Sequence, residues 1–427
     1  MTNSNRRYFL GGSAAALAMI TGPSALAQSA ASGASRAISI GIMGVNGRGK
    51  ALAAGFAKQP DVRVAAICDV DSRAFAPCSQ TIVDAGQTKP TEFGDIRKML
   101  EEKSLDAVAI AAPNHWHAPA TILACKAGKH VYVEKPLSHT PLEGELAVEA
   151  ARKYDRVVTM GTQRRSWPAV REGIERLHSG ELGRVLYSRG WYNNRRPSIG
   201  RGMETSPPSW LNYELWQGPA TESAFHTNYL HYNWHWFWKW GNGELGNNGI
   251  HALDLCRWGL GVDYPSRVVS GGGKYRHEDD QETPDTHTVT YDFGDKAIHW
   301  EGVSWSALGF EHSQYGASFH GEKGTMVMTD SGYVIFDLQN KEKERKAGPE
   351  GLEVHQADFL AAIREGRRPN ADVAEAHKST LLCHLGNIAI RTNSVLTLDR
   401  RNGHIQDNAA AEALWTKEYR ESWALKV

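Results

Sequence analysis

Short apolar runs separated by mixed polar and apolar stretches dominate residues 37–161 of this chain. Each run has the length of a strand and is nearly continuous, as in strands buried on both faces of a parallel sheet. The pattern predicts strands at 37–43, 62–68, 107–112, 130–134 and 157–161, and helices at 50–58, 95–102, 117–127 and 141–154. Such alternation is typical of a doubly wound parallel sheet, and we expect one α/β domain over 37–162.

Beyond residue 163 the apolar runs are separated by Gly and Asp turns, with helical periods only near the end of the chain. This predicts strands at 267–273, 287–293, 297–305 and 333–338, and helices at 352–364 and 374–393. In the segment 225–240 every second residue from Trp234 to Trp240 is tryptophan, as on one face of a strand. We therefore expect an α+β domain over 163–427 with a large, mostly antiparallel sheet.

The first 27 residues have the features of an export signal. Arg6 and Arg7 form a pair, an apolar stretch follows at 10–20, and Ala25 and Ala27 match the A-x-A cleavage pattern. The segment looks like a twin-arginine (Tat) signal, which exports folded proteins. We expect a signal peptide at 1–27, a tether at 28–36 and a periplasmic mature protein without a membrane span; an unprocessed anchor is the alternative.

Composition narrows the classes of partner. With 48 basic and 48 acidic residues among 427, the chain carries no net charge that would attract nucleic acid. The five cysteines show no metal-ligand spacing, and neither do His226, His231 and His235, so no metal is expected. The 14 tryptophans leave aromatic surface for a ligand site or for core packing.

A glycine-rich turn follows the first predicted strand. It reads Gly44-Val45-Asn46-Gly47-Arg48-Gly49 and is close to the dinucleotide-binding G-x-G-x-x-G, with Asn46, a residue that tolerates positive φ, at the second glycine. Alone, the turn also fits an ordinary strand-to-helix connection. Asp69 ends the next strand, 20 residues after Gly49 (69 − 49 = 20), where a carboxylate bonds the adenosine ribose. Together they predict a Rossmann domain that prefers NAD to NADP; helix capping is the other interpretation of Asp69.

Further motifs give the chain a family resemblance. They are Pro113-Asn114-His115-Trp116-His117, Ala127-Gly128-Lys129-His130-Val131, Glu134-Lys135-Pro136, Gly161-Thr162-Gln163-Arg164-Arg165, residues 243–254 and Tyr419-Arg420-Glu421-Ser422-Trp423. The combination resembles the Gfo/Idh/MocA oxidoreductases, in particular their exported, twin-arginine members. The resemblance implies NAD binding through Pro113, Asn114, His117, Glu134 and Gln163.

Lys135 is the central candidate for catalysis. It lies where Rossmann ligands collect, beyond the ends of the strands. A lysine beside the cationic nicotinamide would have a lowered pKa and would accept a proton from a substrate hydroxyl. The resemblance implies the same role, because the lysine of the family's E-K-P motif maps to Lys135. The alternative is that Lys135 is a surface lysine in a loop without a catalytic role.

The second domain contributes a candidate acid/base group. In a helix beginning near Asn248, positions 247, 251 and 254 share one face. The family pattern has Asp and His at the first two, whereas this chain has Asn247 and His251, and an amide cannot stabilise an imidazolium as a carboxylate does. Asp254 supplies part of the missing charge or is structural, and His251 is either catalytic or a core histidine.

Loop residues Arg164, Tyr192 and Arg196 lie where the family closes its substrate pocket, although solvated loop charge fits them equally well. We therefore expect hydride transfer between tightly bound NAD and a CH–OH group of a saccharide or polyol, by net oxidation or by sugar-to-sugar exchange. A glycoside hydrolase acting by transient C3 oxidation and elimination is the first alternative. An NAD-loaded sugar-binding protein without activity is the second, and a homo-oligomer, dimer or tetramer, is expected from the resemblance.

Overall fold

The computed structural model describes residues 37–427, apart from the side chain of Glu311. The predicted signal peptide and tether lie outside the described residues. None of the helices within 37–427 is long and apolar enough to cross a membrane.

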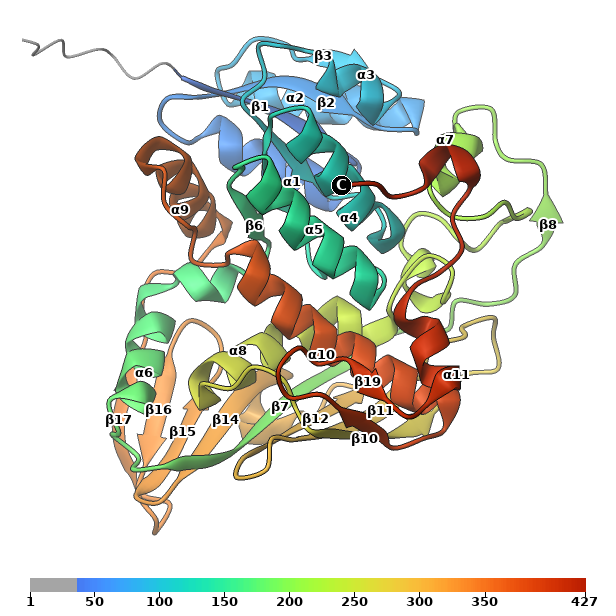
Figure 1. Cartoon of the computed structure of the whole chain (residues 1–427). Helices are drawn as coiled ribbons and strands as arrows, with labels where there is room; N and C mark the ends of the chain where they lie inside the picture. Colours follow the sequence, from blue (N-terminus) through green and yellow to red (C-terminus); the bar gives the residue numbers. More distant parts are fainter. Residues whose placement is uncertain (1–36) are drawn as a thin grey trace, which may run out of the picture. The chain divides into compact units, whose positions relative to one another are not determined.

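The first part of the described chain forms the predicted parallel sheet (Figure 1). Its strands are β1 (Ile38–Met43), β2 (Val62–Cys68), β3 (Thr91–Phe93), β4 (Ala107–Ile110), β5 (His130–Val133) and β6 (Val158–Met160). The order β3-β2-β1-β4-β5-β6, with every pair parallel, is that of a Rossmann fold. The helices are α1 (Arg48–Ala57), α2 (Phe75–Asp84), α3 (Ile96–Leu100), α4 (Asn114–Lys126) and α5 (Pro141–Lys153).

An 11-stranded sheet forms the second part. Its strands are β7 (Val185–Arg195), β10 (Arg267–Gly273), β11 (Thr286–Asp292), β12 (Ala297–Val303), β13 (Trp305–Ser306), β14 (Tyr315–Gly321), β15 (Gly324–Met328), β16 (Tyr333–Phe336), β17 (Glu342–Lys346), β18 (Leu396–Leu398) and β19 (Ile405–Gln406). Only the β7–β12 pair is parallel, so the predicted fold class is confirmed.

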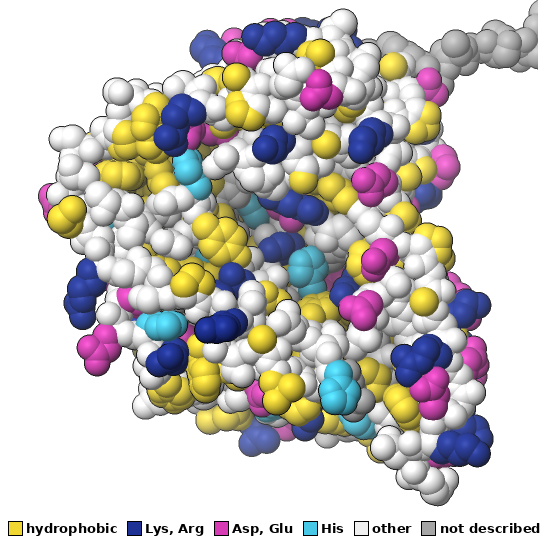
Figure 2. All heavy atoms as spheres, turned by 180° about the vertical axis from the view of Figure 1, so that it is seen from behind, with side chains coloured by type: hydrophobic (Ala, Val, Ile, Leu, Met, Phe, Trp, Pro, Cys, Tyr) yellow, Lys and Arg dark blue, Asp and Glu magenta, His cyan; other side chains and the backbone are white. Residues whose placement is uncertain are grey.

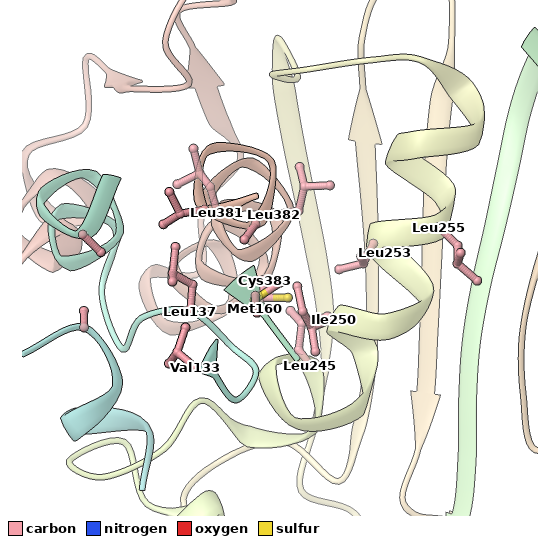
Figure 3. Packing of buried hydrophobic residues seen from close by; sticks show 14 of the residues in the cluster. Val133, Leu137, Met160, Leu245, Ile250, Leu253, Leu255, Leu381, Leu382 and Cys383 are labelled. Carbon is pink, nitrogen blue, oxygen red and sulfur yellow. The ribbon is translucent and has the colours of Figure 1, made fainter. Parts of the chain in front are cut away.

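Further helices are α6 (Pro168–His178), α8 (Ile250–Leu260), α9 (Leu352–Glu365), α10 (Val373–Thr392) and the short α11 (Ala409–Glu412). Helix α8 packs on β7 and β14 of the large sheet, and α10 contacts both α5 of the first part and β10 of the second. One buried cluster joins Val133 and Met160 of the first sheet to Leu245, Ile250 and Leu382 (Figure 3). Phe359 of α9 belongs to the core beside β1, so the two parts share apolar cores.

Residues 204–240, here called the strap, do not form the predicted tryptophan-bearing strand. They contain β8 (Glu204–Thr205), α7 (Tyr213–Gln217), β9 (Phe225–His226) and a 3-10 turn at Asn233–Trp236. Trp216, Trp234 and Trp240 instead pack into a small aromatic core of their own. The spacing of two was misleading because residues in a 3-10 turn do not alternate between two faces as they do in a strand.

Candidate active site

A cavity of about 540 Å³ lies beyond the carboxyl ends of the parallel strands. The face of the molecule in Figure 2 is hollowed, with Lys, Arg and His side chains in the hollow. Most of the predicted site residues line the cavity: Gly44, Asn46, Gly47, Arg48, Asp69, Pro113, Asn114, His117, Glu134, Lys135 and Asn247. The structure therefore brings these predicted residues together around one cavity.

The glycine turn exposes the start of α1 to the cavity. Gly44 has φ +79°, and a Cβ there would lie 2.8 Å from backbone atoms of Ala111. Asn46 is not among the residues with positive φ, so the turn does not use the left-handed conformation that an asparagine tolerates. No side chain caps α1 and its first turn holds no acidic residue, which leaves backbone N–H groups for an anion.

Asp69 is bound to this turn from the end of β2. Its Oδ2 accepts a hydrogen bond from Val45 N (2.6 Å) and its Oδ1 one from Asp71 N (2.9 Å). Burial raises the pKa of Asp69 above its ordinary value, and these two backbone bonds oppose the rise. The capping interpretation of Asp69 is wrong, because the residue that caps the following 3-10 turn is Asp71.

Lys135 leaves the end of β5 and reaches across to the second part of the chain. Its Nζ donates to the main-chain O (2.7 Å) and to Oδ1 (2.9 Å) of Asn247. Burial lowers its pKa from the ordinary value; Glu134 opposes this shift and Arg48 adds to it. A lowered pKa favours the neutral amine, which is the form able to accept a proton.

Glu134 is engaged with the glycine turn. Its Oε1 accepts a hydrogen bond from Arg48 Nε at 2.7 Å, and Oε2 accepts one from Lys135 N at 3.3 Å. Burial alone would raise the pKa of Glu134, but Arg48 and Lys135 hold it below its usual range. The Glu134 carboxylate thereby links the start of α1 to the main-chain N–H of Lys135.

The start of α4 supplies the opposite wall. His117 lies between two carbonyl groups, with Nδ1 2.6 Å from Pro136 O and Nε2 2.8 Å from Ala112 O. Asn114 Oδ1 is buried without a hydrogen-bond partner among residues 37–427. A bound group that donates a hydrogen bond would satisfy it.

Six predicted residues do not line the cavity: Gly49, Gln163, Arg164, Tyr192, Arg196 and His251. Gln163 donates to the Tyr132 hydroxyl in the Rossmann core (3.1 Å). Arg164 donates to Asp330 O (2.7 Å) and lies over a tyrosine ring. Tyr192 accepts a bond from Asn194 Nδ2 (2.9 Å), so each of these three side chains has a partner within the protein.

His251 is placed differently from the expectation. Asn247 lies in a π-helix, Leu245–Gly249, and α8 begins only at Ile250, so one α-helical period does not relate 247 to 251. The ring of His251 lies edge-on to Tyr315, at 6.4 Å between centroids. Burial lowers its pKa well below the ordinary value, and Lys135 and Arg164 lower it further, so the imidazole is neutral near pH 7.

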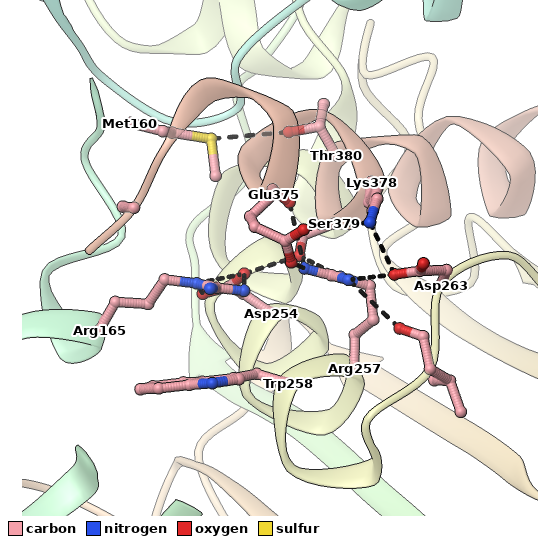
Figure 4. A network of polar contacts seen from close by, with 12 residues as sticks. Met160, Arg165, Asp254, Arg257, Trp258, Asp263, Glu375, Lys378, Ser379 and Thr380 are labelled. Atoms are coloured by element: carbon pink, nitrogen blue, oxygen red, sulfur yellow. Dashed lines mark hydrogen bonds and ion pairs between the residues drawn. The ribbon is translucent and has the colours of Figure 1, made fainter. Parts of the chain in front are cut away.

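Asp254 belongs to a structural network rather than to the site (Figure 4). Arg165 binds its carboxylate through Nε and Nη2 at 2.8–3.0 Å, and Ser379 Oγ donates to it at 2.6 Å. The side chains of Arg165 and Asp254 are 5% and 3% exposed. Of the two interpretations of Asp254, the geometry favours the structural one.

Sequence reasoning missed the strap as part of the site. Strap residues Leu211, Leu215, Trp216, His231, Tyr232, Trp234 and His235 line the cavity. Nδ1 of His235 lies 2.6 Å from Tyr232 O, and burial lowers its pKa well below the ordinary value. The cluster of aromatic and histidine residues was the available signal, but in the sequence it fits a hydrophobic core equally well.

The strap is fastened to the loop after β2, next to Asp69. Ser72 N donates to Trp210 O (3.0 Å) and Asn212 N to Val70 O (2.9 Å). The guanidinium of Arg73 lies 3.2 Å from the centre of the Trp210 ring. His231 Nε2 lies 3.0 Å from Asp71 Oδ2, which adds a side-chain contact to the backbone ones.

These features fit a dinucleotide. The cavity volume lies in the range of cofactor sites, ~300–1,000 Å³, the uncapped helix start suits a pyrophosphate, and Asp69 suits a ribose. The unpartnered Asn114 oxygen points to a missing donor. Fold and cavity together define a dinucleotide-binding protein of the Rossmann type.

Family comparisons identify the group more closely. Residues 38–162 match the model of the Gfo/Idh/MocA oxidoreductase family described as the NAD-binding Rossmann fold. Residues 200–425 match the C-terminal alpha/beta domain of the same family, which is more than half of the chain. The chain belongs to the Gfo/Idh/MocA oxidoreductase family, and its nucleotide is NAD.

Individual relatives are similar over shorter stretches. A glycosyl hydrolase family 109 protein of Saccharopolyspora erythraea is 30% identical over 36% of this chain and 35% of its own length. A levoglucosan dehydrogenase of Pseudarthrobacter phenanthrenivorans is 28% identical over 39% of this chain and 36% of its own. The chain thus matches about a third of the length of these relatives. A Bordetella pertussis dehydrogenase solved with NADH and UDP-GlcNAcA shares the fold, with TM-score 0.64 and 20% identity over 85% of this chain and 99% of that one.

Proposed function

We propose that this protein is an NAD-dependent oxidoreductase that acts on a CH–OH group of a sugar, polyol or glycoside. The observation that carries the proposal is Lys135, a partly buried amine that lines the nucleotide cavity and donates to two oxygens of Asn247. NAD, when bound, supplies the hydride acceptor. The protein contributes the binding surface and a proton acceptor placed beside it.

Lys135 takes the proton of the hydroxyl that is oxidised. A neutral amine has two N–H groups and one lone pair, and Asn247 has an oxygen for each N–H. The lone pair is then left for the substrate hydroxyl. The lowered pKa of Lys135 supports this role, since it keeps the amine unprotonated at a lower pH. His235 lines the cavity as a neutral imidazole and is available for hydrogen bonds with other hydroxyls.

The nucleotide is held between turnovers in this proposal. The strap lines the same cavity as the glycine turn and is fastened to the loop beside Asp69, so it restricts escape of the adenosine end. Retention also suits the proposed export in the folded state, since a protein outside the cytoplasm has no pool of NAD to draw on. Periplasmic location and assembly into a homo-oligomer are further parts of the proposal.

A second candidate function comes from the relatives. Some are named glycosyl hydrolase family 109 proteins and one levoglucosan dehydrogenase. A hydrolase of this kind oxidises C3 transiently, loses the C2 proton and the aglycone by elimination, adds water to the double bond at C1 and returns the hydride to C3. It would use the same Lys135. The two functions differ in one respect: the hydrolase exchanges the C2 hydrogen with solvent, whereas the oxidoreductase does not.

The test uses protein purified without added nucleotide. Mass spectrometry of the denatured protein identifies the released cofactor, and we expect NAD. A panel of sugars, polyols and glycosides is then added, and absorbance at 340 nm is followed. A rise with at least one compound supports the oxidoreductase, deuterium uptake at C2 in D2O supports the hydrolase, and silence in both assays favours a sugar-binding protein.

A further inference from the structure

Glu244 is a buried carboxylate next to the proposed base, and the proposed function does not yet use it. It stands just before the π-helix, and its side chain is only 3% exposed. Its two oxygens accept hydrogen bonds from Arg196 Nε (2.5 Å) and Nη2 (3.2 Å), Asn248 Nδ2 (2.6 Å), Ser304 Oγ (3.3 Å) and Asn247 Nδ2 (3.5 Å). A carboxylate at this depth persists only with such partners, so its position is well determined.

Glu244 determines which way the Asn247 amide faces. Nδ2 of Asn247 donates to Glu244 Oε1 and to the Tyr232 hydroxyl (3.2 Å). A carboxylate only accepts hydrogen bonds, so reversing the amide would set two oxygens against each other. Oδ1 of Asn247 must therefore face Lys135, whose Nζ is 2.9 Å away.

The arrangement compensates for the residue at position 247. An aspartate there would place its charge directly against Lys135 and hold it as ammonium. The asparagine presents a neutral oxygen instead, while the negative charge stands one residue further back, on Glu244, and is balanced by Arg196. Lys135 thus keeps two acceptors without a carboxylate in direct contact.

We propose that Glu244 is a positioning residue, which orients Asn247 toward Lys135 and, paired with Arg196, tunes the charge that Lys135 experiences. The inference rests on the proposed role of Lys135 as proton acceptor. It assigns to the Glu244–Asn247 pair both the orientation of the acceptors around Lys135 and part of the charge near it.

The charges around Lys135 fix the expected signs. The groups that face it are Glu134, Arg48, Glu244, Arg196 and the imidazoles of His117, His235 and His251. Glu244 raises the pKa of Lys135 and Arg196 lowers it. Neutralising Glu244 should therefore lower this pKa, and neutralising Arg196 should raise it.

The experiment measures the ionisation of Lys135 without relying on turnover. The full-length protein is treated with a trace of acetic anhydride at a series of pH values, and modification of Lys135 is quantified by mass spectrometry. We expect the midpoint to fall by about one pH unit in Glu244→Gln and to rise by a similar amount in Arg196→Gln, as for one partly compensated charge nearby. Glu375→Gln breaks another Arg–Glu pair, with Arg257, and should leave the midpoint unchanged.

Midpoint shifts of opposite sign in the two variants distinguish a positioning role from damage to the fold, because loss of structure would shift the Lys135 midpoint in the same direction in both variants. The acid limb of kcat/KM against pH should shift with the labelling midpoint. If the Lys135 midpoint stays within 0.2 unit (about the error of the method) in both variants, or moves the same way in both, the inference is wrong. If the midpoints shift as expected but no compound turns over in the unaltered protein, the positioning role stands and the proposed function fails.

Discussion

Replacing Asp254 by alanine tests whether this carboxylate is structural or supports His251. Asp254 accepts three hydrogen bonds from Arg165 and one from Ser379, and both members of the ion pair are almost fully buried. Removing it leaves the Arg165 guanidinium buried without its carboxylate. Breaking such a pair costs about 3–5 kcal/mol, and we expect a loss of unfolding free energy in this range.

The assay is urea unfolding followed by tryptophan fluorescence and by circular dichroism, because coincident curves justify a free energy. Glu342→Gln is the control: it breaks the exposed pair with Arg345 and should leave the unfolding free energy almost unchanged. Lys135 labelling and bound nucleotide should be unchanged in the folded Asp254→Ala protein. A variant with full stability but no turnover would refute the structural assignment and return Asp254 to the proposed catalytic group.

Three further predictions concern the nucleotide. Gly49→Val should abolish NAD binding, because a side chain there would collide with the carbonyl of Gly44; nucleotide content after purification checks this. Asp69→Ala should weaken NAD binding by about 10- to 100-fold, because a hydrogen bond to a charged group is lost. The preference for NAD over NADP should also become smaller, and titrations of the apoprotein with each nucleotide measure both effects. Trp210→Ala should speed NAD release several-fold by removing the contact of the indole ring with Arg73, and dilution experiments measure the release rate. Equal release rates would exclude a role for the strap.

The sequence pattern predicted a strand or helix well where the residues of that element have similar surroundings along its whole length. The strand at 62–68 is buried along most of its length, and the predicted bounds equal those of β2. The helices at 352–364 and 374–393 agree with α9 and α10 within one residue at each end. Strand β7 was missed because it mixes Arg, Gly and Asn with apolar residues and is buried only in part.

The site was predictable where neighbouring residues carry the chemistry. The glycine turn, Asp69 and the Glu134-Lys135 pair are short motifs at strand ends, and all of them contribute to the cavity. Glu244 had no such signal, since its partner Arg196 is 48 residues away in the chain. Asp254 likewise pairs with a residue distant in the chain, Arg165, which is 89 residues away. Only the folded structure therefore distinguishes a structural Asp254 from one that supports His251.

The most direct test of the central claim is the 340 nm response of Lys135→Ala. The variant, the unaltered protein and the surface control Lys126→Ala are loaded with NAD and mixed with the same active sugar. We predict equal nucleotide content in all three, a normal rate for the control, and a rate about 10²- to 10⁴-fold lower for Lys135→Ala, as expected for loss of a general base. A Lys135→Ala protein that retains NAD and reduces it at the normal rate would contradict the account.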